Sequence, residues 1–503
     1  MTTTADIQTR LMVGMEIHVE LATRSKMFTA APNVACPEFY DAAPNTLTDP
    51  VVLGLPGVLP VINARAVEMA MLVGLALNCR IARFTKWDRK SYYYPDLPKN
   101  YQISQYDQPL CSEGWLEVPL TDDPAGPGKR IRILRAHLEE DAGKLLHEAP
   151  GGLPIDHSIV DLNRAGTPLL EIVTYPDFST AGECVAFAQC LRDLCRTLGV
   201  TEGIMQKGHM RFEPNINVVI QRGGQTYKTP IVEIKNLNSF KAVQGAVEYE
   251  YQRQIDEWLE TGKVMAPGAK STRGWDDASG TTFLQREKED AHDYRYFPDP
   301  DLVPVVVDEA WLARVQASLP ELPRAKRQRY TQTLGLSPRD ADIILGEPRT
   351  AAFFDEIVAI GTDPKRAAAL LLNNLAKLAN AQNRSAADLG LRPVQVKETI
   401  DLLATGQVGS GSTDRLLQAC AAEPSAAAPD LARKHGLIQV SDSGAIETLV
   451  DQVLSDPRNS KAVNDIKGGK AAAIGALVGQ VMKLSKGQAN AQVVRQMLAD
   501  KLK

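Results

Sequence analysis

The segment Val13-Gly14-Met15-Glu16-Ile17-His18-Val19-Glu20-Leu21 alternates apolar and polar side chains. Alternation with a period of two predicts a β-strand, because successive side chains of a strand point to opposite faces. The apolar face would enter a core, while Glu16, His18 and Glu20 would share the other face. Crowded carboxylates repel each other unless a cation neutralises them. The segment therefore predicts either a solvated polar face or a site for a hard divalent cation.

The same alternation recurs further along the chain. It is found in Arg211–Val218, which carries Glu213, and in Ile231–Asn236, which carries Glu233 and Lys235. An ordinary wet sheet face mixes Thr, Ser and Lys with charges of both signs. These segments instead place a carboxylate beside an Asn, Arg or Lys, and that composition suits a metal ion and the phosphates that it bridges.

Length and composition indicate a multidomain globular protein. The 503 residues allow two to four domains, and 44% of them are hydrophobic and 23% charged. A net charge of -5 argues against a protein that coats nucleic acid over its whole surface. No apolar run reaches the length of a membrane span, and the first ten residues lack a hydrophobic signal segment. We expect a cytoplasmic protein without a membrane partner.

The cysteines do not predict a zinc site. There are seven, and no Cys-x-x-Cys pair occurs in the chain. Zinc-binding spacing is absent, and buried thiols are the favoured interpretation.

The distribution of patterns predicts an α+β fold. Residues from about 11 to 300 are strand-rich, and helical spacing is found at 181–198 and 244–259. Because strands and helices do not alternate regularly, an antiparallel sheet is favoured over a doubly wound fold. We expect the first domain to span residues 1–300.

Helices predominate after Pro304. Helix starts are predicted at Ser337-Pro338, at Asp363-Pro364 and at Pro393. The stretch Gly406–Ser412 is rich in Gly and Ser and predicts a hinge. We expect a helical domain at 301–405 and a helical tail domain at 406–503.

The tail is basic. The stretch 458–503 contains nine Lys or Arg residues but only two Asp. An apolar stripe between Ile474 and Leu484 would leave the lysines on the outside. This surface is either simply solvated or a docking surface for a phosphate backbone.

Several long motifs resemble one known family along essentially the whole chain, namely the B subunit of the bacterial-type glutamyl-tRNA(Gln)/aspartyl-tRNA(Asn) amidotransferase. The alternating segment at 13–21 is one of these motifs. The others include Asp-Arg-Lys-Ser-Tyr-Tyr-Tyr-Pro-Asp-Leu-Pro-Lys-Asn-Tyr at 88–101, His-Leu-Glu-Glu-Asp-Ala-Gly-Lys at 137–144, Val-Glu-Ile-Lys-Asn-Leu-Asn-Ser-Phe at 232–240 and Leu-Val-Gly-Gln-Val-Met-Lys-Leu-Ser-Lys-Gly-Gln-Ala-Asn at 477–490.

The resemblance implies a fold and an activity. A sheet-based cradle domain with a polar active-site face would be followed by a helical domain and a mobile tRNA-binding tail. With ATP and Mg²⁺, members of this family phosphorylate the side-chain carboxylate of Glu-tRNA(Gln) or Asp-tRNA(Asn). The A subunit, which is a glutaminase, supplies ammonia through a channel, and the small C subunit joins the other two. The complex is thus a carbon–nitrogen ligase that uses glutamine as amido donor for translation.

The matched motifs imply candidate site residues. Metal candidates are Glu16, His18, Glu140, Glu213 and Glu233, of which Glu16, His18 and Glu140, together with Lys235, are the candidates for catalysis. Phosphate candidates are Lys90, Lys99 and Lys235; a surface salt bridge is the alternative for each lysine. Tyr92, Tyr93, Tyr94 and Asn100 would line the ammonia route or form a packed aromatic loop. Candidates for tRNA binding are Lys461, Lys467, Lys470, Lys483 and Lys486.

The chain departs from the family pattern at two places. Many members carry a zinc site of paired cysteines near the first motif, but this region contains only Cys36, so we expect no zinc. Many members also have Asp where this chain has Glu213, whose longer side chain can still bind a metal. The span from Thr272 to Tyr294 is too short for the inserted domain of the archaeal relative, which favours a complex with the glutaminase (A) and the small C subunits.

Two other classes of protein remain as alternatives. A pure tRNA-binding scaffold is disfavoured, because bare carboxylates repel RNA. A glycoside hydrolase with paired carboxylates would need no ATP. No amidase signature with a catalytic Ser and Lys occurs, so glutamine hydrolysis must come from a partner.

Overall fold

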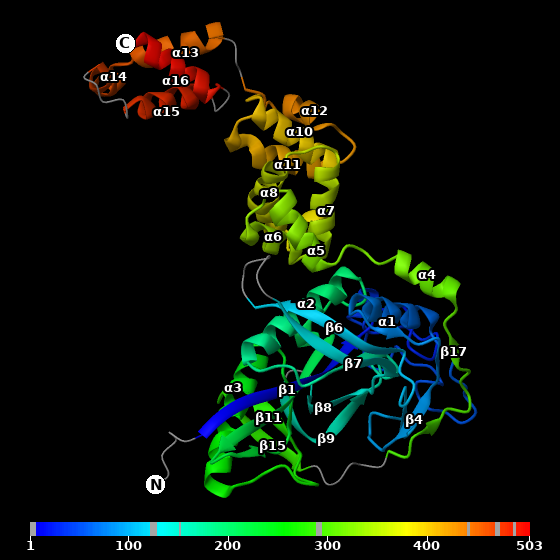
Figure 1. Cartoon of the computed structure of the whole chain (residues 1–503). Coiled ribbons are helices and arrows are strands. Elements are labelled where there is room, and N and C mark those ends of the chain that lie inside the picture. The colour runs from blue at the N-terminus through cyan, green and yellow to red at the C-terminus, as the bar shows by residue number, and fades with distance from the viewer. Residues whose placement is uncertain are drawn as a thin grey trace. The chain divides into compact units, whose positions relative to one another are not determined.

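The structure is a computed structural model that describes residues 7–120, 128–149, 152–287, 294–439, 443–467, 473–485 and 489–502. The chain divides into two compact units, Met1–Ala325 and Lys326–Lys503 (Figure 1). No helix in the described ranges is both long and apolar enough to cross a membrane. The mixture of one large sheet with many helices agrees with the predicted combination of strands and helices.

A 10-stranded sheet is the centre of the first unit. Its strands are β1 (Ile7–Glu20), β2 (Arg80–Ile81), β6 (Cys111–Pro119), β7 (Gly128–Glu140), β10 (Pro168–Thr174), β11 (Met210–Arg222), β12 (Gln225–Lys228), β13 (Val232–Lys235), β14 (Ser271–Asp276) and β15 (Thr281–Glu287). Their order is β15-β14-β13-β11-β1-β10-β7-β6-β2, and β12 pairs with β11. The pairs are antiparallel except for the parallel pair β13–β14.

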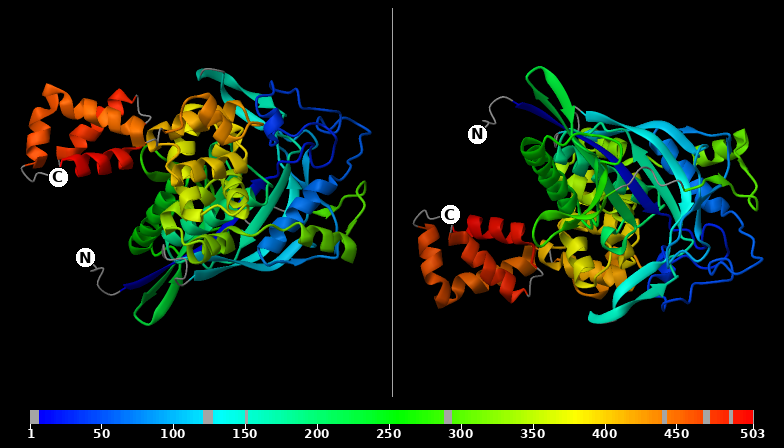
Figure 2. Two further views of the ribbon diagram at one scale, coloured as in Figure 1. Left: turned by 90° about the horizontal axis from the view of Figure 1, so that it is seen from above. Right: turned by 90° about the horizontal axis from the view of Figure 1, so that it is seen from below.

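The alternating segment forms strand β1, as predicted, and β1 lies in the middle of this sheet. Val13, Ile17 and Val19 are completely buried on one face. Both views of Figure 2 show the blue β1 strand beside the green hairpin of β11 and β12. Because β1 has paired neighbours on both sides, its side chains are placed in the centre of the sheet.

Three helices cover the apolar face. They are α1 (Ala64–Ala76), α2 (Ala181–Thr197) and α3 (Phe240–Thr261), and their buried residues share one core with β1. Each begins at a side chain that accepts backbone hydrogen bonds, namely Asn63, Thr180 and Ser239. The helices predicted at 181–198 and 244–259 are confirmed as α2 and α3, and α3 is longer than predicted because it begins at the Ser239 cap.

Smaller elements complete the first unit. They are β3 (Phe84–Thr85), β4 (Asp88–Ser91), β5 (Tyr101–Ser104), β8 (Lys144–Ala149), β9 (Leu153–Asp161), β16 (Phe297–Pro298), β17 (Val305–Val306) and α4 (Glu309–Ala317). Strands β16, β4 and β5 form a separate 3-stranded sheet. Strand β5 packs against the end of β7, where the Gln102 amide donates to the Glu140 carbonyl at 2.8 Å.

The described part of the second unit is helical. Its helices are α6 (Pro338–Leu345), α7 (Pro348–Ala359), α8 (Pro364–Leu370), α9 (Ala376–Ala381), α10 (Pro393–Ala404), α11 (Thr413–Ala422), α12 (Ala428–Lys434), α13 (Ser443–Ser455), α14 (Ser460–Lys467), α15 (Ile474–Leu484) and α16 (Ala491–Lys501), with α5 (Pro323–Gln328) at the junction of the units. The helix starts predicted at Pro338, Pro364 and Pro393 are confirmed.

The described helices of this unit pack into two separate hydrophobic cores. One contains residues from Tyr330 to Leu437, and the other contains residues from Ile446 to Leu502. The first core continues past the predicted hinge, because Val408, Leu416 and Leu417 are buried in it. The change of core thus falls later in the chain than the predicted boundary at residues 405 and 406.

Candidate active site

The polar face of the sheet is built by the register of its strands. His18 on β1 lies opposite Glu171 on β10 and Arg211 on β11, and Glu16 lies opposite Glu213. Residues directly opposite each other on paired strands project from the same face of the sheet. On the far side of β10, Glu171 lies opposite His137 on β7. The polar face of β1 therefore continues across the neighbouring strands as one polar surface.

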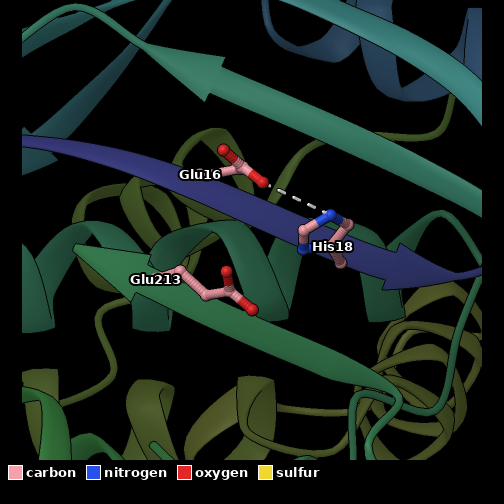
Figure 3. Close-up of side chains that lie close together, drawn as sticks. All are labelled: Glu16, His18 and Glu213. Carbon is pink, nitrogen blue, oxygen red and sulfur yellow. Dashed lines mark ion pairs between the residues drawn. The ribbon is translucent and has the colours of Figure 1, made fainter. Parts of the chain in front are cut away.

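Glu16, His18 and Glu213 form the first cluster on this surface. Each offers a ligand atom, and these atoms lie within 4.8 Å of one another. His18 Nε2 is 3.6 Å from Glu16 Oε1, the contact drawn as a dashed line in Figure 3. The structure therefore brings together three of the residues that the sequence nominates for a metal.

A second cluster shares His18. The Nε2 atom of His18 lies 3.8 Å from Glu139 Oε1 and 3.7 Å from Glu171 Oε2. His137 Nε2 adds a contact of 3.5 Å to Glu171. Glu139, Glu171 and His137 are absent from the sequence-predicted set. Strand alternation after His137 identifies Glu139 as its partner on the same face, but nothing in the sequence indicates that Glu171 lies opposite His18.

Glu140, which the sequence nominates for the metal, is not a member of either cluster found among the described residues. Its side chain leaves β7 on the other face from Glu139, since neighbouring residues of a strand alternate. Its carboxylate accepts the Ile103 backbone N–H at 3.0 Å and pairs with Lys99. Glu140 and Lys99 line a small pocket with Phe28 and Leu97. Lys99 therefore neutralises Glu140, and its role toward phosphate stays a prediction.

Lys235 stands beside the first cluster. Its Nζ is 2.6 Å from Glu213 Oε2 and 3.2 Å from Glu233 Oε1. Burial alone would lower the pKa of Lys235, but the two carboxylates outweigh burial and raise it. Glu233 is not a member of either cluster found among the described residues, so the structure associates it with this lysine rather than with His18.

Lys90 stands beside the second cluster. Its Nζ lies 5.0 Å from the ring centre of Tyr294 and 5.9 Å from that of Tyr92. Burial would lower the pKa of Lys90, but the negative charges of Glu139 and Glu171 raise it. Of the other predicted ammonia-route residues, Tyr93 and Tyr94 are 76% and 55% exposed, and Asn100 is exposed as well. The structure thus brings Tyr92 to this cluster and leaves the other three at the surface.

Burial of the carboxylates on this face disfavours their charged forms when no cation is bound. It raises the pKa of Glu16 and of Glu139 to about 7 each, and in both the charge of Glu171 adds to the effect. Burial would lower the pKa of His18, but its interactions with the carboxylates of Glu171 and Glu213 together outweigh burial, and the pKa rises to about 9. In His137, burial dominates and lowers the pKa to about 4.

Four buried nitrogen atoms on the strands of this face lack hydrogen-bond partners among the described residues. They are His18 Nδ1, Arg135 Nε, His137 Nδ1 and Arg211 Nε. Buried polar atoms are paired in most folded proteins, and exceptions mark places where a ligand or water belongs. The carboxylates and imidazoles offer ligand atoms for a hydrated divalent cation, and the flanking ammonium groups can pair with the phosphate oxygens that it carries.

Three of the five predicted tRNA-binding lysines lie in the last helices that the structure describes. Lys461 and Lys467 are exposed on α14, and Lys483 is exposed on α15. Lys470 and Lys486 lie outside the described residues. The apolar positions Leu477 and Val481 face the core, which leaves the described lysines on the solvent side, as the sequence pattern predicts.

Comparisons with known proteins cover nearly the whole chain. A family model described as "GatB/GatE catalytic domain" matches residues 11–313, and one described as "GatB domain" matches residues 352–502. The chain is 43% identical over 495 residues to a protein of Synechococcus sp. (strain JA-3-3Ab), covering 98% of both chains. It is 42% identical over 493 residues to a protein of Carboxydothermus hydrogenoformans, also covering 98% of both. Each relative is named as the B subunit of an aspartyl/glutamyl-tRNA(Asn/Gln) amidotransferase, and the chain belongs to this family.

Proposed function

We propose that this chain uses ATP to phosphorylate the side-chain carboxylate of Glu-tRNA(Gln), Asp-tRNA(Asn) or both. Ammonia then displaces phosphate and forms the amide, giving Gln-tRNA(Gln) or Asn-tRNA(Asn). Family membership supports a role within a tRNA-dependent amidotransferase, a ligase with glutamine as amido donor. The polar face with two carboxylate clusters flanked by Lys235 and Lys90 is the observation that carries the phosphoryl-transfer step.

Phosphorylation would make the side-chain carboxylate reactive toward ammonia. A carboxylate is a poor electrophile toward ammonia, whereas an acyl phosphate has a good leaving group. Transfer of the terminal phosphoryl group depends mostly on positioning and on neutralising its charge. The site offers cations at both ends, Lys235 beside Glu213 and Lys90 beside Glu139. As compact ammonium groups they suit single phosphate oxygens.

Mg²⁺ fits the residues on this face. Glu16, Glu139, Glu171 and Glu213 would hold it with carboxylate oxygens, and His18 would contact it through a water molecule, because Mg²⁺ prefers oxygen ligands. When bound, the ion neutralises negative charge on the phosphates and orients them. The orphaned His18 Nδ1 and the raised pKa of the buried Glu16 carboxyl support such a cation. The proposal includes no zinc.

The amide-forming step requires ammonia that is shielded from water, because ammonium is not nucleophilic. Tyr92 beside Lys90 would border the end of the ammonia route. The exposed Tyr93, Tyr94 and Asn100 would lie at a surface that a partner protein covers. The proposed partners are the glutaminase (A) and the small C subunits of the complex, and the exposed lysines of α14 and α15 would contact the tRNA backbone.

The test is reconstitution. The chain is co-expressed with the glutaminase and the small C subunits, and formation of Gln-tRNA from Glu-tRNA and of Asn-tRNA from Asp-tRNA is measured with and without ATP. Amide formation that needs ATP, and ATP hydrolysis stimulated by mischarged tRNA, are expected. A complex that binds mischarged tRNA but never consumes ATP would show a scaffold instead. Activity on glycosides without ATP would favour the hydrolase alternative.

A further inference from the structure

Thr272 on β14 contacts the site from a strand to which no role has been assigned. In the parallel pair β13–β14, Thr272 lies directly opposite Glu233, and Gly274 lies opposite Lys235. Thr272 is 1% exposed, and its hydroxyl donates a hydrogen bond of 3.0 Å to Glu233 Oε2. A hydrogen bond to a carboxylate is stronger than one between neutral groups, and the branched side chain of Thr restricts the direction of its hydroxyl.

This hydroxyl begins a continuous line of charged contacts. The second oxygen of Glu233, Oε1, is 3.2 Å from Lys235 Nζ, and Lys235 is 2.6 Å from Glu213 Oε2. Glu213 belongs to the first cluster with His18. Because Thr272 holds one oxygen of Glu233, the other oxygen faces Lys235. The position of the ammonium group beside the cluster therefore depends on the orientation of the Glu233 carboxylate.

Strand β14 itself is held by other contacts on its opposite face. Arg273 Nε donates to Thr282 Oγ1 at 2.8 Å and lies 3.2 Å from Glu250 Oε1. Glu250 is completely buried on α3, and the Thr282 hydroxyl also donates to it. These contacts anchor β14 and β15 to the helix without involving Thr272. The chain thus offers two buried threonines on neighbouring strands, each bonded to a glutamate, one on the polar face and one on the helix face.

We propose that Thr272 is a positioning residue for ATP, acting through Glu233 to hold Lys235 in the place where it meets phosphate. This inference rests on the proposed function and adds to it a residue that lies outside both clusters and contacts Glu233. Loss of the hydroxyl leaves Glu233 Oε2 buried without this donor and releases the carboxylate to rotate. Lys235 then loses a fixed counter-charge while its own charge is unchanged.

The experiment uses the complex of this chain reconstituted with its glutaminase and small C subunits. Thr272→Val removes the hydroxyl at nearly constant shape, and Thr272→Ser restores it. Thr282→Val is the matched control, because it makes the same change on the helix face. Equilibrium affinity for a non-hydrolysable ATP analogue, kcat and KM for ATP in amidation, and the melting temperature are measured for each.

Thr272→Val should weaken analogue binding and lower kcat/KM for ATP by roughly tenfold to a hundredfold, with glutamine hydrolysis unchanged. Thr272→Ser should come within about threefold of wild type. Thr282→Val should lower the melting temperature and leave analogue affinity within about twofold. This pattern separates positioning from general stability, because only the polar-face change moves ATP affinity.

Three outcomes would overturn the inference. They are wild-type affinity and kcat/KM in Thr272→Val, equal losses of affinity in the two Val variants, and a Ser variant no better than the Val variant. A wild-type complex without ATP-dependent amidation would instead refute the proposed function. The two failures are thus distinguished by the wild-type enzyme.

Discussion

Adjacent residues on β7 give the sharpest test of the site, because the same substitution has different consequences on the two faces of one strand. Glu139 Oε1 lies 3.8 Å from His18 Nε2 in the second cluster, whereas Glu140 pairs with Lys99 and Ile103. We expect Glu139→Gln to impair phosphoryl transfer and Glu140→Gln to impair stability. Gln keeps the size and hydrogen-bonding capacity of Glu and removes only the charge.

The magnitudes follow from the distances and the burial. A unit charge about 4 Å from a partner contributes about 4 kcal/mol at the effective dielectric constant of about 20 that is typical of proteins. Reorganisation and water reduce this, and a loss of about 3 kcal/mol corresponds to a rate lower by about two orders of magnitude. In Glu140→Gln the side chain of Lys99, 12% exposed, loses its counter-charge. Breaking such a buried pair costs about 3 kcal/mol of unfolding free energy.

The assay measures mischarged-tRNA-dependent ATP hydrolysis and amidation in the reconstituted complex, together with the melting temperature of each variant. Glu139→Gln should lose activity at nearly unchanged melting temperature and leave glutamine hydrolysis partly intact. Glu140→Gln should unfold at lower temperature and keep most of its turnover below that temperature. The reverse pattern, with Glu139→Gln active and Glu140→Gln inactive yet fully stable, would refute the placement of the site on the His18 face.

Three further perturbations are predicted. Lys235→Met should raise KM for ATP by at least about tenfold, since it removes the ammonium beside Glu213, and an unchanged KM would exclude phosphate contact. Replacing Lys461, Lys467 and Lys483 by Ala should weaken tRNA binding and flatten its log–log salt dependence by up to about 0.9 per lost phosphate contact, and equal slopes would indicate a merely solvated surface. Lys26 is fully buried, and burial lowers its pKa from 10.5 to about 8. Between pH 8 and 10.5 the unfolded state therefore binds more protons than the folded state, so Lys26 makes the unfolding free energy of the wild type rise with pH by up to about 3 kcal/mol. Lys26→Met should lack this rise when the unfolding free energy is measured by denaturant titration across this pH range. The same pH dependence in both proteins would contradict the expectation.

The local pattern of the sequence was enough to predict the elements and part of the site. The period of two in β1 separates Ile17 from Glu16 and His18, and this depends only on backbone geometry. Helical spacing and capping residues predict α2 and α3, and Pro with a preceding Ser or Asp marks the starts of α6 and α8. Alternation also places Glu213 and Glu233 on polar faces before any strand pairing is known.

Only the tertiary structure decided which side chains of distant strands lie next to each other. Register between strands far apart in the chain places Glu171 opposite His18, and no local pattern encodes that pairing. The same register selects Glu139 over Glu140, because a shift of one residue sends a strand side chain to the other face. Thr272 reaches Glu233 only because β14 pairs in parallel with β13. Sequence alone determined which side chains each element offers, whereas long-range pairing determined which of them share one site.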